Sequence, residues 1–338
     1  MAEKPFVLVT ERIADVGLQL LEKSCEVCAP WRQGRTYSEE QLRAAQAVIV
    51  RLCRVTAGML SAAPKLKVIG RHGAGLDNVD LEAATERGIP VVFTPSALTM
   101  ANAVAEHTVQ MMLALARHTV TADKMVREGR FKQRSSLQGV ELYQKKLGII
   151  GLGAIGERVA EICHKGLGMR ILAYDPYVDE HLPQVDITLV HSLPELLRQA
   201  DVVTLHLPST AETSYMIDAD ALRCMKPSAM LINTARGAVV DTVALAEALC
   251  RGELLGAALD VFEKEPPPLN HPLFSAPRTL FSPHIGSSTG AAMERMAELV
   301  ARQVVQVLRG EHPPFVANPE VFERGPATSQ VLQLPFLH

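Results

Sequence analysis

The chain has 338 residues, more than one hydrophobic core usually holds, so its length predicts two domains. Hydrophobic residues make up 48% and charged residues 21%, with a formal net charge of −3, which argues against nucleic acid or an anionic membrane as a partner. The N-terminus lacks a secretory signal pattern and the six cysteines are scattered, with no second ligand pair beside Cys25-x-x-Cys28, so we expect reduced thiols, a cytoplasmic location and no bound metal.

Short apolar runs alternate with helical stretches along most of the chain. Two series of strands are expected, at 6–10, 47–52, 66–70 and 90–93, and at 147–151, 170–175, 201–205, 229–233, 256–260 and 279–282. Continuous apolar strands separated by helices form parallel sheets that are buried on both faces, so the fold class is α/β. We expect two doubly wound, Rossmann-like domains with an active-site cleft between them.

The boundary between these domains is expected inside a long helical pattern. It extends from about residue 99 to residue 129, enough for one helix that crosses between the domains. A final helix over about 289–309 would return the chain to the first series of strands. We therefore expect a discontinuous first domain of residues 1–98 and 288–338, and a second domain of residues 99–287. The proline-rich tail after Gly310 is expected to be an extended strap.

A glycine-rich turn follows the expected strand 147–151 and precedes a helix expected over 157–168. It contains Gly151, Gly153 and Gly156 in the spacing G-x-G-x-x-G. The first glycine permits a tight turn, the second lets a pyrophosphate approach the backbone, and the third lets the helix pack closely on the strand. Free N–H groups and the helix dipole would then hold the phosphates of a dinucleotide.

Asp175 strengthens this interpretation, because it ends the next expected strand about 20 residues after Gly156. A carboxylate at that place can accept hydrogen bonds from the adenosine ribose, and it would repel a 2′-phosphate. Residues 176–178 offer no Arg that could bind such a phosphate. The sequence therefore predicts NAD rather than NADP as the cofactor.

Three strand ends of the second series contain ionisable residues, at the edge where an open α/β sheet binds its ligands. Arg236 could hold a carboxylate and polarise a neighbouring carbonyl, although a strand-end Arg is often only a salt-bridge partner. Asp260, Glu263 and Glu265 follow another strand, and their pattern does not say which acid acts. His284 follows the last strand, and histidine, with an ordinary pKa of about 6.5, suits proton transfer near neutral pH.

Longer runs of sequence resemble a known family. They are GRHGAGLDNVD at 70–80, GLGAIG at 151–156, NTARG at 233–237, AALDVF at 257–262 and PHIG at 283–286. In this order, and over nearly the whole chain, they resemble the D-isomer-specific 2-hydroxyacid dehydrogenases. Within that family the chain is most similar to the D-3-phosphoglycerate dehydrogenases, in a short form without a regulatory domain.

The resemblance implies an NAD-dependent oxidoreductase that transfers hydride between NAD(H) and C2 of a D-2-hydroxy or 2-keto acid. The first domain would bind substrate and the second NAD. The resemblance makes His284 the acid–base residue, Glu265 its paired acid, and Arg236 a residue of both catalysis and substrate binding. It also implies that the backbone of Ala74 and Gly75 holds the substrate carboxylate. Further implied cofactor contacts, added to the glycines and Asp175, are Ala74, Ala154, Ile155, Leu207, Thr234, Ala235, Asp260 and Gly286.

The substrate is open between several 2-keto acids. 3-Phosphoglycerate and phosphohydroxypyruvate are favoured by Arg51, Arg54 and Arg71, which lie near strand ends of the first series and could bind a phosphate. Leu98 and Met100 lie in a loop that departs from the family's usual length, and they indicate instead hydroxypyruvate, glyoxylate or another less polar 2-keto acid.

A function of another class is an NAD(H)-sensing, corepressor-like binding protein, which needs no turnover. The presence of Arg236, Glu265 and His284 favours the enzyme, and NADH oxidation with a panel of 2-keto acids would separate the two. The family resemblance also suggests a homodimer through the helix after Thr99.

Overall fold

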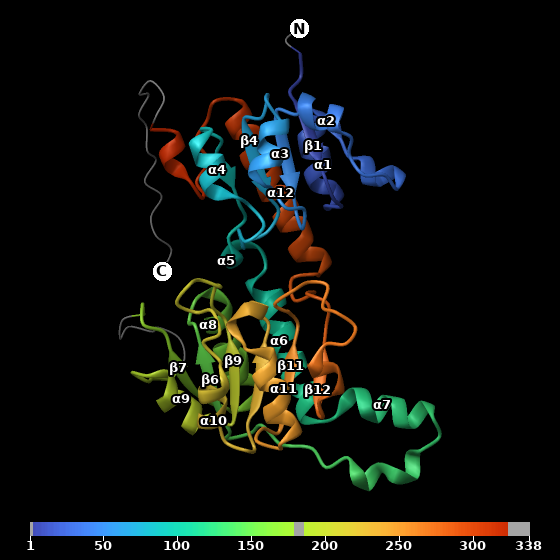
Figure 1. The fold of residues 1–338 in the computed structure, drawn as a ribbon, viewed down its shortest axis with the longest axis vertical. Helices are drawn as coiled ribbons and strands as arrows, with labels where there is room; N and C mark the ends of the chain where they lie inside the picture. Colours follow the sequence, from blue (N-terminus) through green and yellow to red (C-terminus); the bar gives the residue numbers. More distant parts are fainter. Residues whose placement is uncertain (1–2, 179–185, 324–338) are drawn as a thin grey trace. The chain divides into compact units, whose positions relative to one another are not determined.

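The computed structural model describes residues 3–178 and 186–323, and the chain divides into two compact units. Unit 1 comprises Met1–Thr99 and Gly290–His338, and unit 2 comprises Met100–Thr289. Each unit has one parallel sheet with helices on both faces (Figure 1), so the predicted α/β class with two Rossmann-like sheets is confirmed. The cleft expected between the domains stays a prediction.

Unit 1 contains a five-stranded sheet in the order β2-β1-β3-β4-β5. Its strands are β1 (Phe6–Val9), β2 (Glu26–Cys28), β3 (Ala47–Val50), β4 (Val68–Arg71) and β5 (Val91–Val92). Its helices are α1 (Asp15–Glu22), α2 (Glu39–Ala44), α3 (Ala57–Ala62), α4 (Leu81–Glu86), α5 (Ser96–Thr99) and α12 (Gly290–Leu308).

Alternation along each strand divides the core of unit 1 into two halves, because successive side chains of a strand point to opposite faces. Val7 and Val9 pack with α1 and α12, whereas Leu8 packs with α2, α3 and α4. The expected return of the final helix to the first series of strands is thus observed, since α12 contacts β3, β4 and β5.

The segment after Gly310 runs antiparallel beside β5. Val316 pairs with Val92, and the N–H of Ala317 donates to the carbonyl of Val91. Asn318 is fully buried, and its side chain accepts from the N–H of Val91 and donates to the carbonyl of Ile89. The expected strap is therefore present as far as residue 323, and residues 324–338 lie outside the described part.

Unit 2 contains a seven-stranded parallel sheet in the order β12-β11-β10-β9-β6-β7-β8. The strands are β6 (Lys146–Ile150), β7 (Arg170–Tyr174), β8 (Ile187–Leu189), β9 (Val202–Leu205), β10 (Met230–Asn233), β11 (Gly256–Leu259) and β12 (Thr279–Phe281). The helices are α6 (Ala101–Ala116), α7 (Thr119–Arg127), α8 (Ala154–Leu167), α9 (Leu193–Gln199), α10 (Ala219–Cys224) and α11 (Thr242–Cys250). Helices α6 and α8 pack on one face and α9, α10 and α11 on the other.

The single helix expected over 99–129 is wrong, because two helices, α6 and α7, occupy this region. The short α5 ends at Thr99, and α6 begins at Ala101. His118 has a φ of 53°, in the left-handed region that side chains rarely adopt, and this residue separates α6 from α7. In Figure 1, α7 extends away from the sheet of unit 2.

All ten expected strands are present, with limits shifted by a few residues. Two edge strands, β2 and β8, were not expected. Within the described residues, no helix is long and apolar enough to cross a membrane.

Candidate active site

The glycine-rich turn connects β6 to α8, as the sequence predicts. Gly151 has a φ of 88°, and a Cβ there would lie 2.4 Å from the carbonyl oxygen of His206. At Gly156 a Cβ would lie 2.3 Å from the carbonyl oxygen of Gly151, so the start of α8 touches the turn itself. Gly153 is the N-cap of α8, and a Cβ there would meet no atom within 4 Å. The turn is thus packed on one side and open at Gly153.

The N-terminus of α8 has no side-chain cap. The first N–H groups of a helix have no intrahelical acceptor, so those of Ala154, Ile155 and Gly156 can receive an anion, aided by the helix dipole. A pyrophosphate fits this arrangement, because the open side at Gly153 lets it approach the backbone.

Asp175, the residue after β7, connects two loops of this region. One carboxylate oxygen accepts the N–H of Leu152 at 2.8 Å, and the other accepts the N–H of Tyr177 at 3.0 Å. Leu207 lies across the turn, since its Cβ is 3.2 Å from the position of a Cβ on Gly151. The structure therefore brings Asp175 and Leu207 together with the glycine-rich turn.

The loop after β10 contains Thr234, Ala235 and Arg236. Asn233 is fully buried and shapes this loop, because its amide donates to the carbonyl of Arg236 and accepts from the N–H of Ala235. The Arg236 guanidinium donates to the carbonyl of Ala235 at 2.8 Å. Gly237 touches the next loop so closely that a Cβ would overlap the carbonyl carbon of Phe262. The loops that hold Arg236 and the acidic run are thus packed together.

His284 pairs with Glu265 rather than with Glu263. Nδ1 of His284 lies 2.7 Å from Oε2 of Glu265, whose other oxygen accepts the N–H of Phe262 at 3.1 Å. Glu263 instead accepts the N–H of Thr242 at the start of α11. Among the three acids left open by the sequence pattern, the structure therefore places Glu265 beside His284.

The environment of Glu265 favours its charged form. Burial raises the pKa of this carboxyl, but the hydrogen bonds from His284 and from the Phe262 N–H outweigh that effect, and the pKa lies below its ordinary value. At neutral pH, Glu265 is therefore a carboxylate that can stabilise a positive charge on the imidazole beside it.

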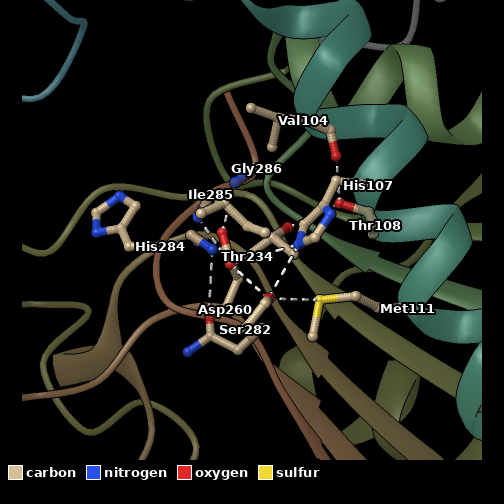
Figure 2. A network of polar contacts seen from close by, with 12 residues as sticks. Val104, His107, Thr108, Met111, Thr234, Asp260, Ser282, His284, Ile285 and Gly286 are labelled. Atoms are coloured by element: carbon tan, nitrogen blue, oxygen red, sulfur yellow. Dashed lines mark hydrogen bonds and ion pairs between the residues drawn. The ribbon is translucent and has the colours of Figure 1, made fainter. Parts of the chain in front are cut away.

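Asp260 is buried, and other groups of unit 2 surround its carboxylate (Figure 2). It accepts hydrogen bonds from the Ser282 hydroxyl and from the N–H groups of Ile285 and Gly286. His107, on α6, lies next to this group. The sequence pattern did not predict that Ser282 and His107 contact Asp260, because a lone histidine on an apolar helix is usually an ordinary core residue. The cofactor contact expected at Asp260 stays a prediction.

Unit 1 contains the remaining expected substrate residues, at the carboxyl ends of its strands. The carboxylate of Glu11 accepts the backbone N–H groups of Arg51, Leu52 and Cys53, so it fixes the loop after β3. The Arg71 guanidinium donates to the carbonyl of His72. Sequence reasoning missed this role of Glu11, since a lone acid after the first strand has no partner in the pattern.

The turn after β4 contains Ala74 and Gly75, and both are half-buried. His72, just before this turn, is buried. Its burial, with Arg51 nearby, lowers the pKa of His72 to about 4. Of the two apolar residues expected near the substrate, Leu98 is 53% exposed and Met100 is buried. In the described part of the chain, no group of three or more His, Cys, Asp or Glu side chains could hold a metal ion.

Comparison with known proteins identifies the class. Residues 109–286 match the model of the D-isomer specific 2-hydroxyacid dehydrogenase family, NAD binding domain. The chain belongs to this family, and it is an NAD-dependent D-2-hydroxyacid dehydrogenase. The family, the enzyme class and the cofactor predicted from the sequence are thereby confirmed.

Particular relatives differ in their names. A glyoxylate reductase of Pyrococcus furiosus is 42% identical over 331 residues, which is 95% of this chain and 97% of the relative. A D-3-phosphoglycerate dehydrogenase of Methanocaldococcus jannaschii is 40% identical over 92% of this chain but only 59% of its own length. The crystal structure of the TT0316 protein from Thermus thermophilus has a TM-score of 0.82 and 39% identity, over 92% of this chain and 99% of that one. The substrate, the homodimer and the cytoplasmic location stay predictions.

Proposed function

We propose that this enzyme reduces a 2-keto acid to the D-2-hydroxy acid, with His284 as acid–base residue, Glu265 as its partner and Arg236 as the substrate-binding cation. The observation that supports this most is the 2.7 Å contact between His284 and Glu265. It lies at the carboxyl end of a parallel sheet, the edge where such sheets bind ligands and where the glycine-rich turn also lies.

Bound NADH supplies the hydride that C2 of the substrate receives. Arg236 binds the substrate carboxylate and polarises the keto group, which prepares C2 for reduction. Protonated His284 gives its Nε2 proton to the developing alkoxide, and Nδ1–H stays on Oε2 of Glu265. The charged Glu265 stabilises the imidazolium before transfer. In the reverse direction, neutral His284 removes the hydroxyl proton.

The cofactor-binding residues are proposed from their places around the turn. The backbone of residues 153–156 would hold the pyrophosphate, and Asp175 the adenosine ribose. Asp175 also orders the turn through Leu152, so its role is both to bind and to position. Leu207, Thr234, Ala235 and Gly286 would line the rest of the cofactor site, with Ala74 of unit 1.

For the substrate we propose glyoxylate or another short, unphosphorylated 2-keto acid. The Arg71 guanidinium lies on the carbonyl of His72, and Leu52 at the tip of the adjoining loop is 68% exposed. An exposed apolar side chain after β3 and an arginine after β4 that already donates to a backbone carbonyl suit a small substrate better than a phosphate. The name of the Pyrococcus furiosus relative supports the same choice. Ala74 and Gly75 would bind the substrate carboxylate through their backbone.

Phosphohydroxypyruvate is the second candidate, because Arg51, Arg54 and Arg71 lie near two neighbouring strand ends of unit 1. The Methanocaldococcus jannaschii relative supports it, although this chain spans only part of that protein.

One experiment tests both candidates. NADH oxidation is measured with glyoxylate, hydroxypyruvate, pyruvate and phosphohydroxypyruvate, and the values of kcat/KM are compared. We expect glyoxylate to give the highest value. A higher value for phosphohydroxypyruvate would replace the first candidate with the second. Tight NADH binding without turnover of any of the four would favour an NAD(H)-sensing protein.

A second copy of this chain is the proposed partner of α7. Val120 and Val126 on this helix and Phe131 in the following turn Phe131–Ser136 are each about 60% exposed, an apolar set that favours association. Light scattering should give a dimer for the wild type and a monomer for Val126→Glu. A monomeric wild type would contradict the proposal.

A further inference from the structure

His107 connects helix α6 to the loop that contains His284. Its Nε2 lies 3.0 Å from Oγ of Ser282 and 3.4 Å from Oδ1 of Asp260, although Ser282 is 175 positions away in the chain. The side chain of His107 is 16% exposed and that of Asp260 is 2% exposed. Figure 2 shows these three side chains gathered beneath the loop.

Asp260 fixes the backbone on both sides of the His284 side chain. Its own carbonyl accepts the N–H of His284 at 2.7 Å. Its carboxylate accepts the N–H of Ile285 at 2.9 Å and that of Gly286 at 2.8 Å. Three consecutive N–H groups of the loop are therefore bound by one residue.

This loop needs support, because His284 has a φ of 54°. A non-glycine residue uncommonly adopts the left-handed region, and it persists there where its surroundings enforce it. The hydrogen bonds to Asp260 provide that enforcement. These hydrogen bonds require that the Asp260 carboxylate stays ionised and keeps its orientation, although it is almost fully buried.

The hydroxyl of Ser282 shows how His107 contributes. A hydroxyl has one hydrogen, and Ser282 donates it to Oδ1 of Asp260 at 2.5 Å, since this charged oxygen is a stronger acceptor than the Met111 sulfur 3.6 Å away. Oγ of Ser282 can then only accept from His107, so Nε2 of His107 bears a hydrogen. That N–H is directed at the serine and at the carboxylate behind it. Burial raises the pKa of Asp260, but the hydrogen bonds from His107, from Ser282 and from the two N–H groups lower it below the ordinary value.

We propose that His107 is a positioning residue for His284. It acts through Ser282 on Asp260, and it keeps the Asp260 carboxylate ionised and oriented. Asp260 then holds the left-handed backbone of His284, so that the imidazole stays beside Glu265. This inference rests on the proposed acid–base role of His284. It predicts that a change on α6 slows the chemical step without touching substrate or cofactor.

The first test compares His107→Ala, His107→Gln and the wild type, with glyoxylate and NADH. For His107→Ala we expect kcat to fall about tenfold, the loss that one hydrogen bond to a charged group explains. The dissociation constant of NADH should change less than kcat does, because the proposed cofactor contacts around the glycine-rich turn stay in place, and the isotope effect of NADH deuterated at the transferred position should increase. Glutamine offers an N–H near the place of Nε2, so His107→Gln should recover most of kcat.

The matched control is His118→Asn. His118 follows α6 directly, and its Nε2 contacts the carbonyl of Gln138 away from this network. Asparagine tolerates its left-handed backbone, so kcat should stay within twofold of the wild type. A comparable fall in His118→Asn would make the effect of His107→Ala unspecific and overturn the proposal.

A double variant shows whether the path is the one proposed. If His107 acts through Ser282, adding His107→Ala to Ser282→Ala should cost little beyond Ser282→Ala alone. If the double variant instead loses the product of the two single-variant factors in kcat, the proposed path is overturned. A kcat of His107→Ala within twofold of the wild type would also overturn it.

A proton NMR signal separates this proposal from the proposed function. The Nδ1–H of His284 on Glu265 should give a downfield resonance, assigned by its absence from His284→Ala. In His107→Ala we expect this resonance to broaden or exchange faster, whether or not any 2-keto acid is turned over. An unchanged resonance would overturn the positioning role. Absence of wild-type turnover with a responsive resonance would overturn only the proposed reaction.

Discussion

The two units share an architecture but differ in the residues at the carboxyl ends of their strands. In unit 2 these ends contain a paired histidine and acid, a loop-borne arginine and a glycine-rich turn with a helix N-terminus behind it. In unit 1 they contain Arg51, Arg71 and a buried His72, and a glutamate bound to backbone N–H groups. The paired histidine and acid proposed for proton transfer thus lie in unit 2.

The difference shows that a parallel sheet supplies an edge for ligands and does not choose their chemistry. In unit 2, the charged Glu265 lies 2.7 Å from Nδ1 of His284, an arrangement that suits a histidine that exchanges its Nε2 proton with a substrate. In unit 1, Glu11 holds a loop in place. We propose that Glu265 supports the reaction and that Glu11 only shapes its loop, and the predictions below test this contrast.

The largest effect is expected at His284. His284→Ala removes the proton donor, so kcat should fall by roughly 10²–10⁴-fold while NADH binding stays intact. Stopped-flow NADH oxidation and fluorescence titration measure the two quantities. Near-normal turnover would contradict the assignment of acid–base chemistry to unit 2.

A second effect concerns stability and compares one histidine from each unit. Burial first, then Arg51, lowers the pKa of His72 to about 4, and burial lowers that of His206 in unit 2 to about 3. Each binds a proton in the unfolded chain before it does so in the folded one, so stability is full above pH 6.5 and is lost as the pH falls toward these values. For His72 the loss is about 3 kcal/mol.

The check is urea unfolding of His72→Leu between pH 4 and pH 7. The pH dependence of its unfolding free energy should flatten by about that amount, and the exposed His191→Leu should keep the wild-type dependence. An unaltered dependence in His72→Leu would show that His72 has the same pKa in the folded and the unfolded chain.

The third prediction separates two neighbouring acids of unit 2. Glu265→Gln removes the charge beside His284, and the loss of such a hydrogen bond, about 1.5–3 kcal/mol, lowers kcat roughly 10- to 100-fold. Glu263→Gln keeps an acceptor for the Thr242 N–H and should be nearly normal. Steady-state kinetics of both variants decides, and a larger loss in Glu263→Gln would reverse the assignment.

The smallest effect is expected at Asp175. Asp175→Ala removes the acceptor of the Leu152 N–H and the proposed ribose contact, so the KM for NADH should rise about tenfold, the effect of one hydrogen bond. The KM for NADPH should fall, because the repelling charge is gone. Equal changes for both cofactors would mean that Asp175 only shapes the turn.

The strands could be predicted from sequence because most are continuous apolar runs, such as Met230–Asn233. The edge strands Glu26–Cys28 and Ile187–Leu189 could not, because each has three residues, mixed polarity and partial burial. The helix break at His118 also left no sign, since neither glycine nor proline marks it.

The site shows the same limit. The glycine-rich turn and Asp175 were evident because their spacing follows from the geometry of a strand, a turn and a helix. The choice between Glu263 and Glu265 needed the family resemblance, because both lie in one irregular loop, two positions apart. His107 and Ser282 meet only in three dimensions, so no spacing along the chain could pair them.

The return of α12 and the strap to unit 1 has a consequence for synthesis on the ribosome. Unit 2 is one continuous stretch and is complete as soon as residue 289 has left the exit tunnel. Unit 1 must wait, because α12 covers one face of its sheet and Asn318 binds the N–H of Val91. Its first hundred residues therefore spend the translation of about two hundred more with an apolar sheet face uncovered, a period in which nascent-chain chaperones have their target.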